Sequence, residues 1–419
     1  MLAWLVACAS DPDTGAPIGD SADSADSADS GGDPAPDPAC AAAGCLRSAR
    51  SLGSWTREDL RPYVDAAVTL ENGYEVLVVE YLTESGPTTG TVTLPLDLVG
   101  DAPPSGFPVV VNAHGTVGLD DVCRLSGTVS GSGLAGLFGA RGAIGVAPDY
   151  PGLGSPGYHR YLDARAEATS VLDAIRAAAQ VARWRAVPDN GRSAVVGLSQ
   201  GGHAALAAAT WHSRYAPELD VRAFAASGPA SGWHEHWAPY IDIAGGHLVM
   251  HALLAWSYAE ATGTDDAGVW ADTLAPTVDA HLTTRCYWSP DFGAEPLLSD
   301  GFPVRPADVF TAPFREAWAS GDWGAWPALG DRFSDNRIEP WLAEGEQTAA
   351  IAVWQGTDDT TVLPWMTQDL VAGLRAGGVE VELTLVEGGT HTTTAFGFLA
   401  TPELATDPSL AWVRARLEE

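Results

Sequence analysis

Short runs of apolar, β-branched residues recur along the chain and alternate with glycine-rich turns. The first two runs, 74–82 and 88–94, are split by a Ser-Gly-Pro turn and predict paired strands. Further strands are predicted at 107–112, 143–147, 193–197, 221–226, 351–354 and 381–386, and alanine-rich helices at 162–185, 201–214, 364–376 and 408–417. Strands that alternate with helices predict an α/β fold, in which a mostly parallel sheet carries helices on both faces.

One long interval breaks this alternation. More than a hundred residues separate the strands at 221–226 and 351–354, and this interval is rich in tryptophan. A structureless loop of that length is implausible, and residues 247–260 predict an apolar helix within it. We therefore predict a helical cap at 229–345, inserted into a core that is formed by residues 48–228 and 346–419.

Composition excludes several classes of function. The 419 residues are 46% hydrophobic and 18% charged, so most of the chain can bury a core. With 22 basic and 54 acidic residues, the net charge of −32 argues against nucleic acid or an anionic membrane surface as a partner. All the basic residues are Arg, which excludes Schiff-base chemistry, a P-loop lysine and a Ser-Lys dyad. No apolar run reaches the roughly 18 residues that a membrane-spanning helix needs.

The N-terminus predicts export. Residues 1–8 end in Leu5-Val-Ala-Cys8, which matches a bacterial lipobox with Cys8 as the acylated residue; the alternative is a chance cysteine in a short apolar stretch. Residues 9–47 predict a disordered acidic tether, because they are rich in Ser, Asp and Pro. We expect an exported protein, either anchored in the cell envelope through a lipid or secreted.

Cysteine usage agrees with export. Without Cys8, four cysteines remain at Cys40, Cys45, Cys123 and Cys286, an even number that is compatible with two disulfides outside the cytosol. Cys40 and Cys45 are close enough for a small local loop, which would leave the other two to pair. The sequence alone permits three pairings.

The central chemical signal is a serine between a strand and a helix. A buried strand runs into Gly197-Leu-Ser199-Gln-Gly201, and an alanine-rich helix follows. This is the context of a nucleophile elbow, in which tight turns require glycine and the serine lies at the positive end of a helix. We therefore predict that Ser199 is a nucleophile.

An acid and a base follow Ser199 in the chain. Proteins with a nucleophile elbow carry the three groups in the order Ser, acid, His. Only His391 lies beyond the last plausible acid, in a Gly-rich loop after the last strand. The loop after residue 354 offers Asp358 and Asp359, and the spacing Gly356-x-x-Asp359-x-x-Val362 selects Asp359. Asp358 is expected to point to solvent or to cap the turn.

An oxyanion hole needs two backbone N–H donors. We expect one from Gln200, the residue after the nucleophile, and one from Thr116, in the loop after the strand at 107–112. His114 is expected to hold that loop in place. His234 and His236 could suggest a metal site, but nearby histidines on a cap are more often polar surface, so we predict no metal.

Three segments resemble the secretory lipase family in order and spacing: Gly145-Val-Ala-Pro-Asp-Tyr-Pro-Gly-Leu-Gly154, Gly197-Leu-Ser-Gln-Gly-Gly-His203 and Tyr215-Ala-Pro-Glu-Leu219. The resemblance runs from about residue 50 to the end. It implies an α/β-hydrolase core, a helical cap over the acyl site, no cofactor, and the triad Ser199, Asp359 and His391. Asp120-Asp-Val-Cys123 resembles the family's cysteine-bearing segment, whose partner lies in the cap, and this favours a Cys123–Cys286 bridge.

These observations predict a monomeric lipase or carboxylesterase that acts on lipid or other small-molecule esters and touches a membrane only through its N-terminal lipid. The alternatives are a serine peptidase on the same fold and a non-catalytic binding protein on a hydrolase scaffold. The helix from residue 247 is apolar on nearly every face, so it is buried or faces an apolar ligand. We expect Leu248, Leu253, Leu254 and Trp256 to include residues that line an acyl-chain pocket; the alternative is that they only hold the cap together.

Overall fold

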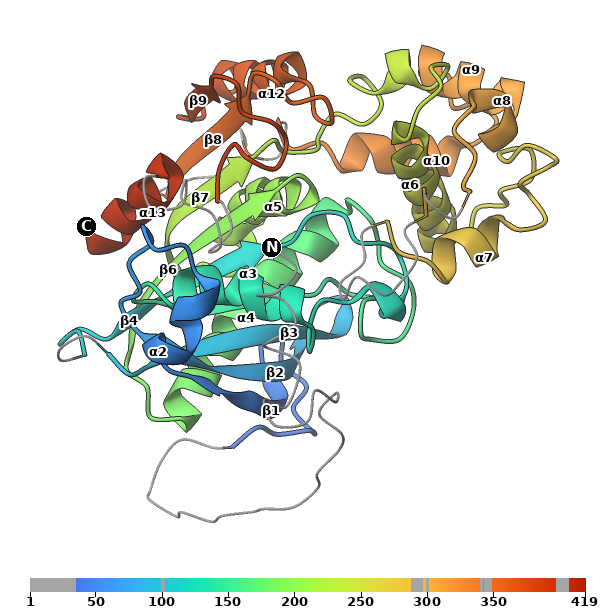
Figure 1. Ribbon diagram of the computed structural model, residues 1–419. Coiled ribbons are helices and arrows are strands. Elements are labelled where there is room, and N and C mark those ends of the chain that lie inside the picture. The colour runs from blue at the N-terminus through green and yellow to red at the C-terminus, as the bar shows by residue number, and fades with distance from the viewer. Residues whose placement is uncertain are drawn as a thin grey trace.

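The computed structural model describes residues 35–98, 102–287, 297–298, 301–339, 342, 349–396 and 407–419. Nine strands in these ranges form one sheet in the order β1-β2-β3-β5-β4-β6-β7-β8-β9 (Figure 1). Their bounds are β1 Leu46–Trp55, β2 Gly73–Thr83, β3 Gly86–Leu96, β4 Phe107–Ala113, β5 Ile144–Pro148, β6 Asp189–Leu198, β7 Asp220–Ser227, β8 Ala350–Gly356 and β9 Glu382–Val386.

The sheet has an antiparallel edge and a parallel body. The pairs β1–β2, β2–β3 and β3–β5 are antiparallel, and every pair from β5 through β4 to β9 is parallel. This confirms the predicted mostly parallel α/β sheet. Because the strands from β4 to β9 run the same way, the loops at their carboxyl ends meet at one edge of the sheet, where α/β proteins bind ligands.

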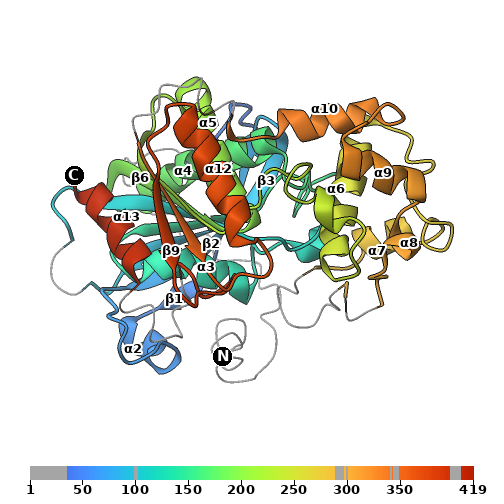
Figure 2. The same cartoon turned by 90° about the horizontal axis from the view of Figure 1, so that it is seen from above.

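Helices cover both faces of the sheet (Figure 2). One face carries α4 (Ala164–Trp184), α5 (Gln200–Tyr215) and α12 (Pro364–Ala376); the other carries α2 (Arg57–Leu60), α3 (Val129–Gly139) and α13 (Pro408–Glu418). The strands alternate accordingly: on β4, Val109 and Val111 join the core under α4, whereas Val110 joins the core under α3. No helix among the described residues is both long and apolar enough to cross a membrane.

The elements that were absent from the predicted set include β1 and α3. Helix α3 is rich in Gly and Ser, a composition that is typical of turns. Its glycines allow close packing on the sheet: a Cβ added at Gly139 would lie 2.2 Å from Thr93 Oγ1, and one at Gly136 would lie 2.7 Å from the Tyr74 hydroxyl oxygen. This helix is therefore held by its fit to the strands rather than by its own helix propensity.

Between β7 and β8 the chain forms a helical region with its own apolar core (Figure 1). Its described helices include α6 (His247–Thr262), α7 (Val278–Thr283), α8 (Pro306–Val309), α9 (Ala312–Ser320) and α10 (Pro327–Asp335). We call this region the cap. Its core contains Trp233, Trp237 and Trp318, and it extends onto the sheet domain through Tyr161 and Val362.

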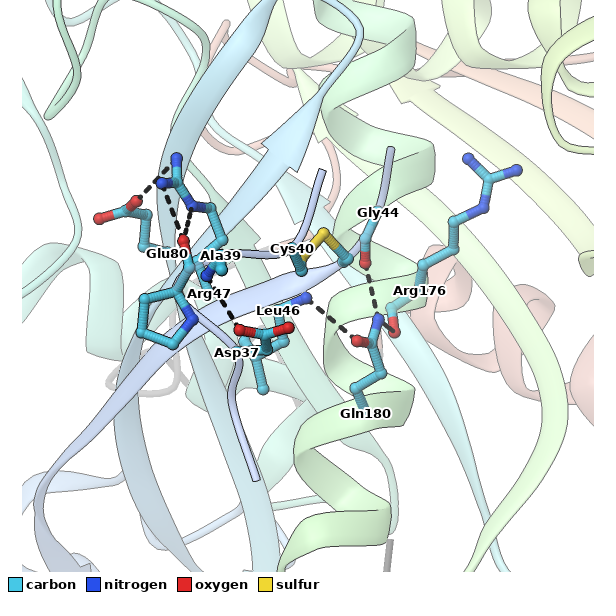
Figure 3. Close-up of a disulfide and its surroundings, with 11 residues drawn as sticks. Asp37, Ala39, Cys40, Gly44, Leu46, Arg47, Glu80, Arg176 and Gln180 are labelled. Atoms are coloured by element: carbon cyan, nitrogen blue, oxygen red, sulfur yellow. Dashed lines mark hydrogen bonds and ion pairs between the residues drawn. A yellow bond between two sulfur atoms is a disulfide. The ribbon is translucent and has the colours of Figure 1, made fainter. Parts of the chain in front are cut away.

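The four described cysteines form two disulfides, Cys40–Cys45 and Cys123–Cys286. The first closes a short loop that lies against α4 (Figure 3). Gln180 of α4 donates from Nε2 to the Gly44 carbonyl oxygen at 2.7 Å, and its Oε1 accepts from the Leu46 N–H at 3.0 Å. The folded part of the chain therefore begins before residue 48, where the sequence placed the end of the tether.

The second disulfide joins the cap to the loop that follows β4. Cys286 lies at the end of the cap's first half, and the next residue, Tyr287, donates its N–H to the Val117 carbonyl oxygen at 2.8 Å. The Cys123 sulfur packs on the same loop, since a Cβ added at Gly118 would lie 2.5 Å from it. One covalent bond thus fastens the cap beside the carboxyl end of β4.

Loss of this bridge should destabilise the protein far more than loss of the other. The bridged cysteines are separated by 163 residues in Cys123–Cys286 and by 5 in Cys40–Cys45. In the chain-entropy model these loops correspond to about 5 and about 2 kcal/mol. Urea unfolding of the Cys123→Ser/Cys286→Ser protein, with Cys40→Ser/Cys45→Ser as the matched control, measures the difference. Equal losses in the two proteins would contradict it.

Candidate active site

Ser199 joins β6 to α5 in a strained turn. Its φ of 60° and ψ of −117° lie outside the regions that L-residues prefer. Small neighbours make the turn possible, because a Cβ added at Gly201 would lie 1.9 Å from the Ala113 carbonyl oxygen, and one at Gly197 would lie 2.1 Å from the Gly201 carbonyl oxygen. The half-buried Ser199 side chain therefore stands at the carboxyl end of β6 and at the N-terminus of α5.

Asp359 and His391 form a hydrogen-bonded pair after β8 and β9. His391 Nδ1 lies 2.7 Å from Asp359 Oδ2, and the Asp359 side chain is 1% exposed. The other carboxylate oxygen, Oδ1, accepts the N–H groups of Thr361 at 2.8 Å and Val362 at 3.0 Å. Because several donors fix this carboxylate, it in turn fixes the orientation of the His391 ring.

Asp358, the alternative acid, is exposed, as expected from the sequence. Its backbone nevertheless helps to hold the two loops together, since the Asp358 N–H donates to the Gly389 carbonyl oxygen at 3.0 Å. The Thr357 N–H donates to the Val386 carbonyl oxygen at 3.0 Å, and the Gly388 N–H donates to Thr357 Oγ1 at 2.8 Å. The acid-bearing loop and the histidine-bearing loop thus form one hydrogen-bonded unit.

This hydrogen-bonded unit packs on Gly228, close to the serine. Gly228 follows Ser227, whose carbonyl oxygen accepts the Ser199 N–H at 2.9 Å. A Cβ added at Gly228 would lie 3.3 Å from His391 Cε1 and 3.2 Å from Asp359 Oδ2, so the ring and the carboxylate pack directly on this glycine. Ser199, Asp359 and His391 therefore surround one dipeptide at the end of β7. Gly228 was not among the site residues predicted from the sequence; the small size of this dipeptide, which permits the close approach, is the signal that could have indicated it.

The loop after β4 also packs against the serine. A Cβ added at Gly115 would lie 3.7 Å from Ser199 Cβ, and the next residue is Thr116, whose Oγ1 lies 2.8 Å from the Tyr161 hydroxyl oxygen. His114 is buried, with Nδ1 2.7 Å from the Gly115 carbonyl oxygen, and burial lowers its pKa. A neutral, hydrogen-bonded His114 holds the loop. Thr116 thus follows a glycine that packs on Ser199, and Gln200, the first residue of α5, follows Ser199 in the chain.

The cap residues predicted to contact an acyl chain lie in the cap core. Leu248, Leu253 and Leu254 are fully buried in it, and Trp256 is almost so. Trp256 Nε1 donates to Asp279 Oδ1 at 2.9 Å, and the Trp256 ring meets the exposed Tyr158 ring edge-on. A pocket-lining role for these residues stays a prediction.

The remaining predicted positions are placed as follows. His236 Nε2 lies 3.0 Å from Asp369 Oδ2, whereas the His234 ring packs edge-on against Trp323, so the two histidines face different neighbours. The described residues contain no cluster of three or more His, Cys, Asp or Glu side chains that could hold a metal ion. Cys8 lies outside the described residues.

Solved structures of known proteins share this architecture. The rice cell wall degrading esterase LipA from Xanthomonas oryzae matches with a TM-score of 0.71 and 19% identity, over 90% of this chain and 97% of that one. Candida antarctica lipase A in its closed state matches with a TM-score of 0.63 and 16% identity, over 90% of this chain and 83% of that one. The fold is that of the α/β hydrolases.

Within this α/β-hydrolase fold, residues 135–245 match the sequence profile of the secretory lipase family. The matched segment includes β6, Ser199 and α5. No curated protein sequence matches the chain. The profile match agrees with the resemblance seen in the sequence and covers the elbow, whereas the loops that carry Asp359 and His391 lie beyond it.

Proposed function

We propose that this protein is a serine hydrolase that cleaves carboxylic esters, most of all lipid esters, through an acyl-enzyme. The observation that carries the proposal is the Asp359–His391 pair packed on Gly228, next to Ser227, whose carbonyl oxygen accepts the Ser199 N–H. The secretory lipase profile and the structural similarity to an esterase and a lipase support it.

In the proposed mechanism His391 takes the proton of Ser199 Oγ as that oxygen attacks the ester carbonyl carbon. The Thr116 and Gln200 N–H groups stabilise the oxyanion of the tetrahedral intermediate. The C–O bond to the alcohol breaks, and His391 returns the proton to the departing oxygen. Water then attacks the acyl-enzyme by the same route and releases the acid. Asp359 keeps the proton of His391 on Nδ1 and stabilises the charged ring.

A substrate panel tests this function. A series of p-nitrophenyl esters from acetate to palmitate, run beside peptide anilides, should show ester turnover and no anilide turnover. A fluorophosphonate probe should label Ser199. Anilide turnover that exceeds ester turnover would favour a peptidase, and a protein that the probe leaves unlabelled would favour a non-catalytic binding protein.

We also propose that the cap contributes an acyl-chain site through the buried face of α6. Replacing Leu253 or Leu254, singly, with Trp should lower activity on palmitate esters by at least ~10-fold relative to acetate esters, because a filled pocket rejects the longer chain. The ratio of the two rates in variants that still fold is the measurement. An equal fractional loss on both esters, or only a lower melting temperature, would assign these residues to the cap core alone.

We further propose that the protein is exported, with Cys8 as the site of a lipid anchor. The lipobox-like Leu5-Val-Ala-Cys8 and the acidic composition of the residues that follow it support an anchor. The two disulfides among the described cysteines support an oxidising compartment.

A further inference from the structure

A buried carboxylate lies against the first turn of α5. Glu167 belongs to α4, and its side chain is 0% exposed. Its Oε1 accepts from Gln200 Nε2 at 2.7 Å, and its Oε2 is 2.7 Å from His203 Nδ1. The Leu162 N–H also donates to Oε1, at 3.1 Å. One carboxylate on α4 therefore holds two side chains of α5, the first of them directly after Ser199.

The hydrogen-bond partners fix the direction of the Gln200 amide. Its Nε2 carries two hydrogens: one meets Glu167 Oε1, and the other faces His159 Nε2 at 2.5 Å. Burial lowers the pKa of His159 to about 3, so its ring is neutral and can accept a hydrogen bond. With the amide reversed, its oxygen would face a carboxylate. The Gln200 side chain is therefore held in one orientation by acceptors on both sides.

The same contacts reach both sides of the proposed oxyanion hole. Gln200 carries one of its N–H donors, and His203 lies one turn later, where its N–H donates to the Ser199 carbonyl oxygen at 3.0 Å. On the other side, the His159 ring stacks on Tyr150 with centroids 5.2 Å apart. The Tyr150 hydroxyl donates to the His114 carbonyl oxygen at 3.0 Å, two residues before Thr116.

An isolated buried carboxylate is costly, and well-packed apolar residues often stabilise a core as well or better. Burial accordingly raises the pKa of Glu167, while its hydrogen bonds to His203 and Gln200 oppose that shift. A carboxyl group at this fully buried position is therefore poorly explained by stability alone. Its partners suggest that it holds the first turn of α5 in register with the strained Ser199.

We propose that Glu167 is a positioning residue for the oxyanion hole, acting through Gln200 and His203; this rests on the proposed ester hydrolase function. Glu167 does not contact substrate. Its hydrogen bonds to the side chains of Gln200 and His203 fix the direction of the Gln200 backbone N–H. The donor matters most when the oxyanion forms, so misplacing it should slow turnover and leave substrate binding nearly unchanged.

The test compares Glu167→Gln with Asp173→Asn as the matched control. Asp173 is a second carboxylate of α4 with a side chain that is 0% exposed, but it bonds Arg176 of the same helix and Tyr215 at the far end of α5. For Glu167→Gln, kcat on a p-nitrophenyl ester should fall on the order of 10²-fold while KM stays within about 3-fold. The Ki of a trifluoromethyl ketone, whose adduct forms the oxyanion, should rise in parallel. Asp173→Asn should lower only the melting temperature.

Gln200→Met provides a second variant that keeps the backbone N–H and the Glu167–His203 contact, in case Glu167→Gln does not fold. It should show the same loss of kcat and of ketone affinity. Values of kcat and Ki within about 2-fold of wild type in the folded variants would overturn the inference while leaving the hydrolase function intact. A wild-type protein that turns over none of the esters would overturn the proposed function, and the inference with it.

Discussion

Ser199→Ala should lower kcat for p-nitrophenyl ester hydrolysis by roughly 10⁶-fold, because it removes the atom that forms the acyl-enzyme. A residual rate of roughly 10³–10⁴ over water should remain from binding and the oxyanion hole. The fold should survive, since the Ser199 side chain makes no capping hydrogen bond to α5 and its backbone N–H still meets Ser227. Steady-state kinetics with a melting curve on the same sample measures both quantities.

Ser193→Ala is the matched control for this variant. Ser193 is a buried serine of the same strand, β6, and its hydroxyl lies near the Asp220 carbonyl oxygen at the opposite end from the elbow. Its activity should stay within about 2-fold of wild type. Near-normal turnover by a folded Ser199→Ala protein would exclude the serine mechanism.

Asp359→Asn should reduce kcat on the order of 10⁴-fold, whereas Asp358→Asn should change it by less than about 2-fold. The amide that Asp359→Asn introduces could offer an N–H to His391 Nδ1 and so hold the ring in the tautomer that cannot accept the serine proton. Asp358 is exposed, and the hydrogen bond that it gives to Gly389 comes from its backbone, which the substitution leaves in place.

The two aspartates are neighbours of equal chemistry, so each variant is the control for the other. A severe defect in Asp358→Asn, with a mild one in Asp359→Asn, would mean that the acid lies one residue earlier than proposed.

The buried strands could be predicted because each is a compact apolar run. Those from β4 to β8 are covered on both faces, and such strands read as continuous Val, Ile and Ala. Strand β1 could not, because it is an edge strand whose residues are mostly polar and partly exposed. Helix α3 could not, because its glycines are required by contacts with Thr93 and Tyr74 that only the assembled sheet provides.

The candidate site divides in the same way. Ser199, Asp359 and His391 lie shortly after the ends of β6, β8 and β9, so spacing in the sequence locates them. Gly228 and Glu167 could not be found by spacing, because their roles depend on neighbours that are distant in sequence: His391 for one, and Gln200 for the other. A glutamate among the alanines of α4 was nevertheless a signal of a functional or structural role, since it lies on a face whose other residues are mostly apolar and buried.

The Cys40–Cys45 loop determines where the N-terminal segment, and any molecule attached to it, meets the folded domain. The loop leads into β1, and four strands, β2, β3, β5 and β4, separate β1 from the strand that carries Ser199. At about 4.8 Å between neighbouring strands, this places the entry point ~24 Å to the side of β6. Gln180 holds the loop there through two hydrogen bonds (Figure 3). A lipid, a solid support or a fusion partner attached at that end would therefore leave the carboxyl ends of β6 to β9 open to substrate.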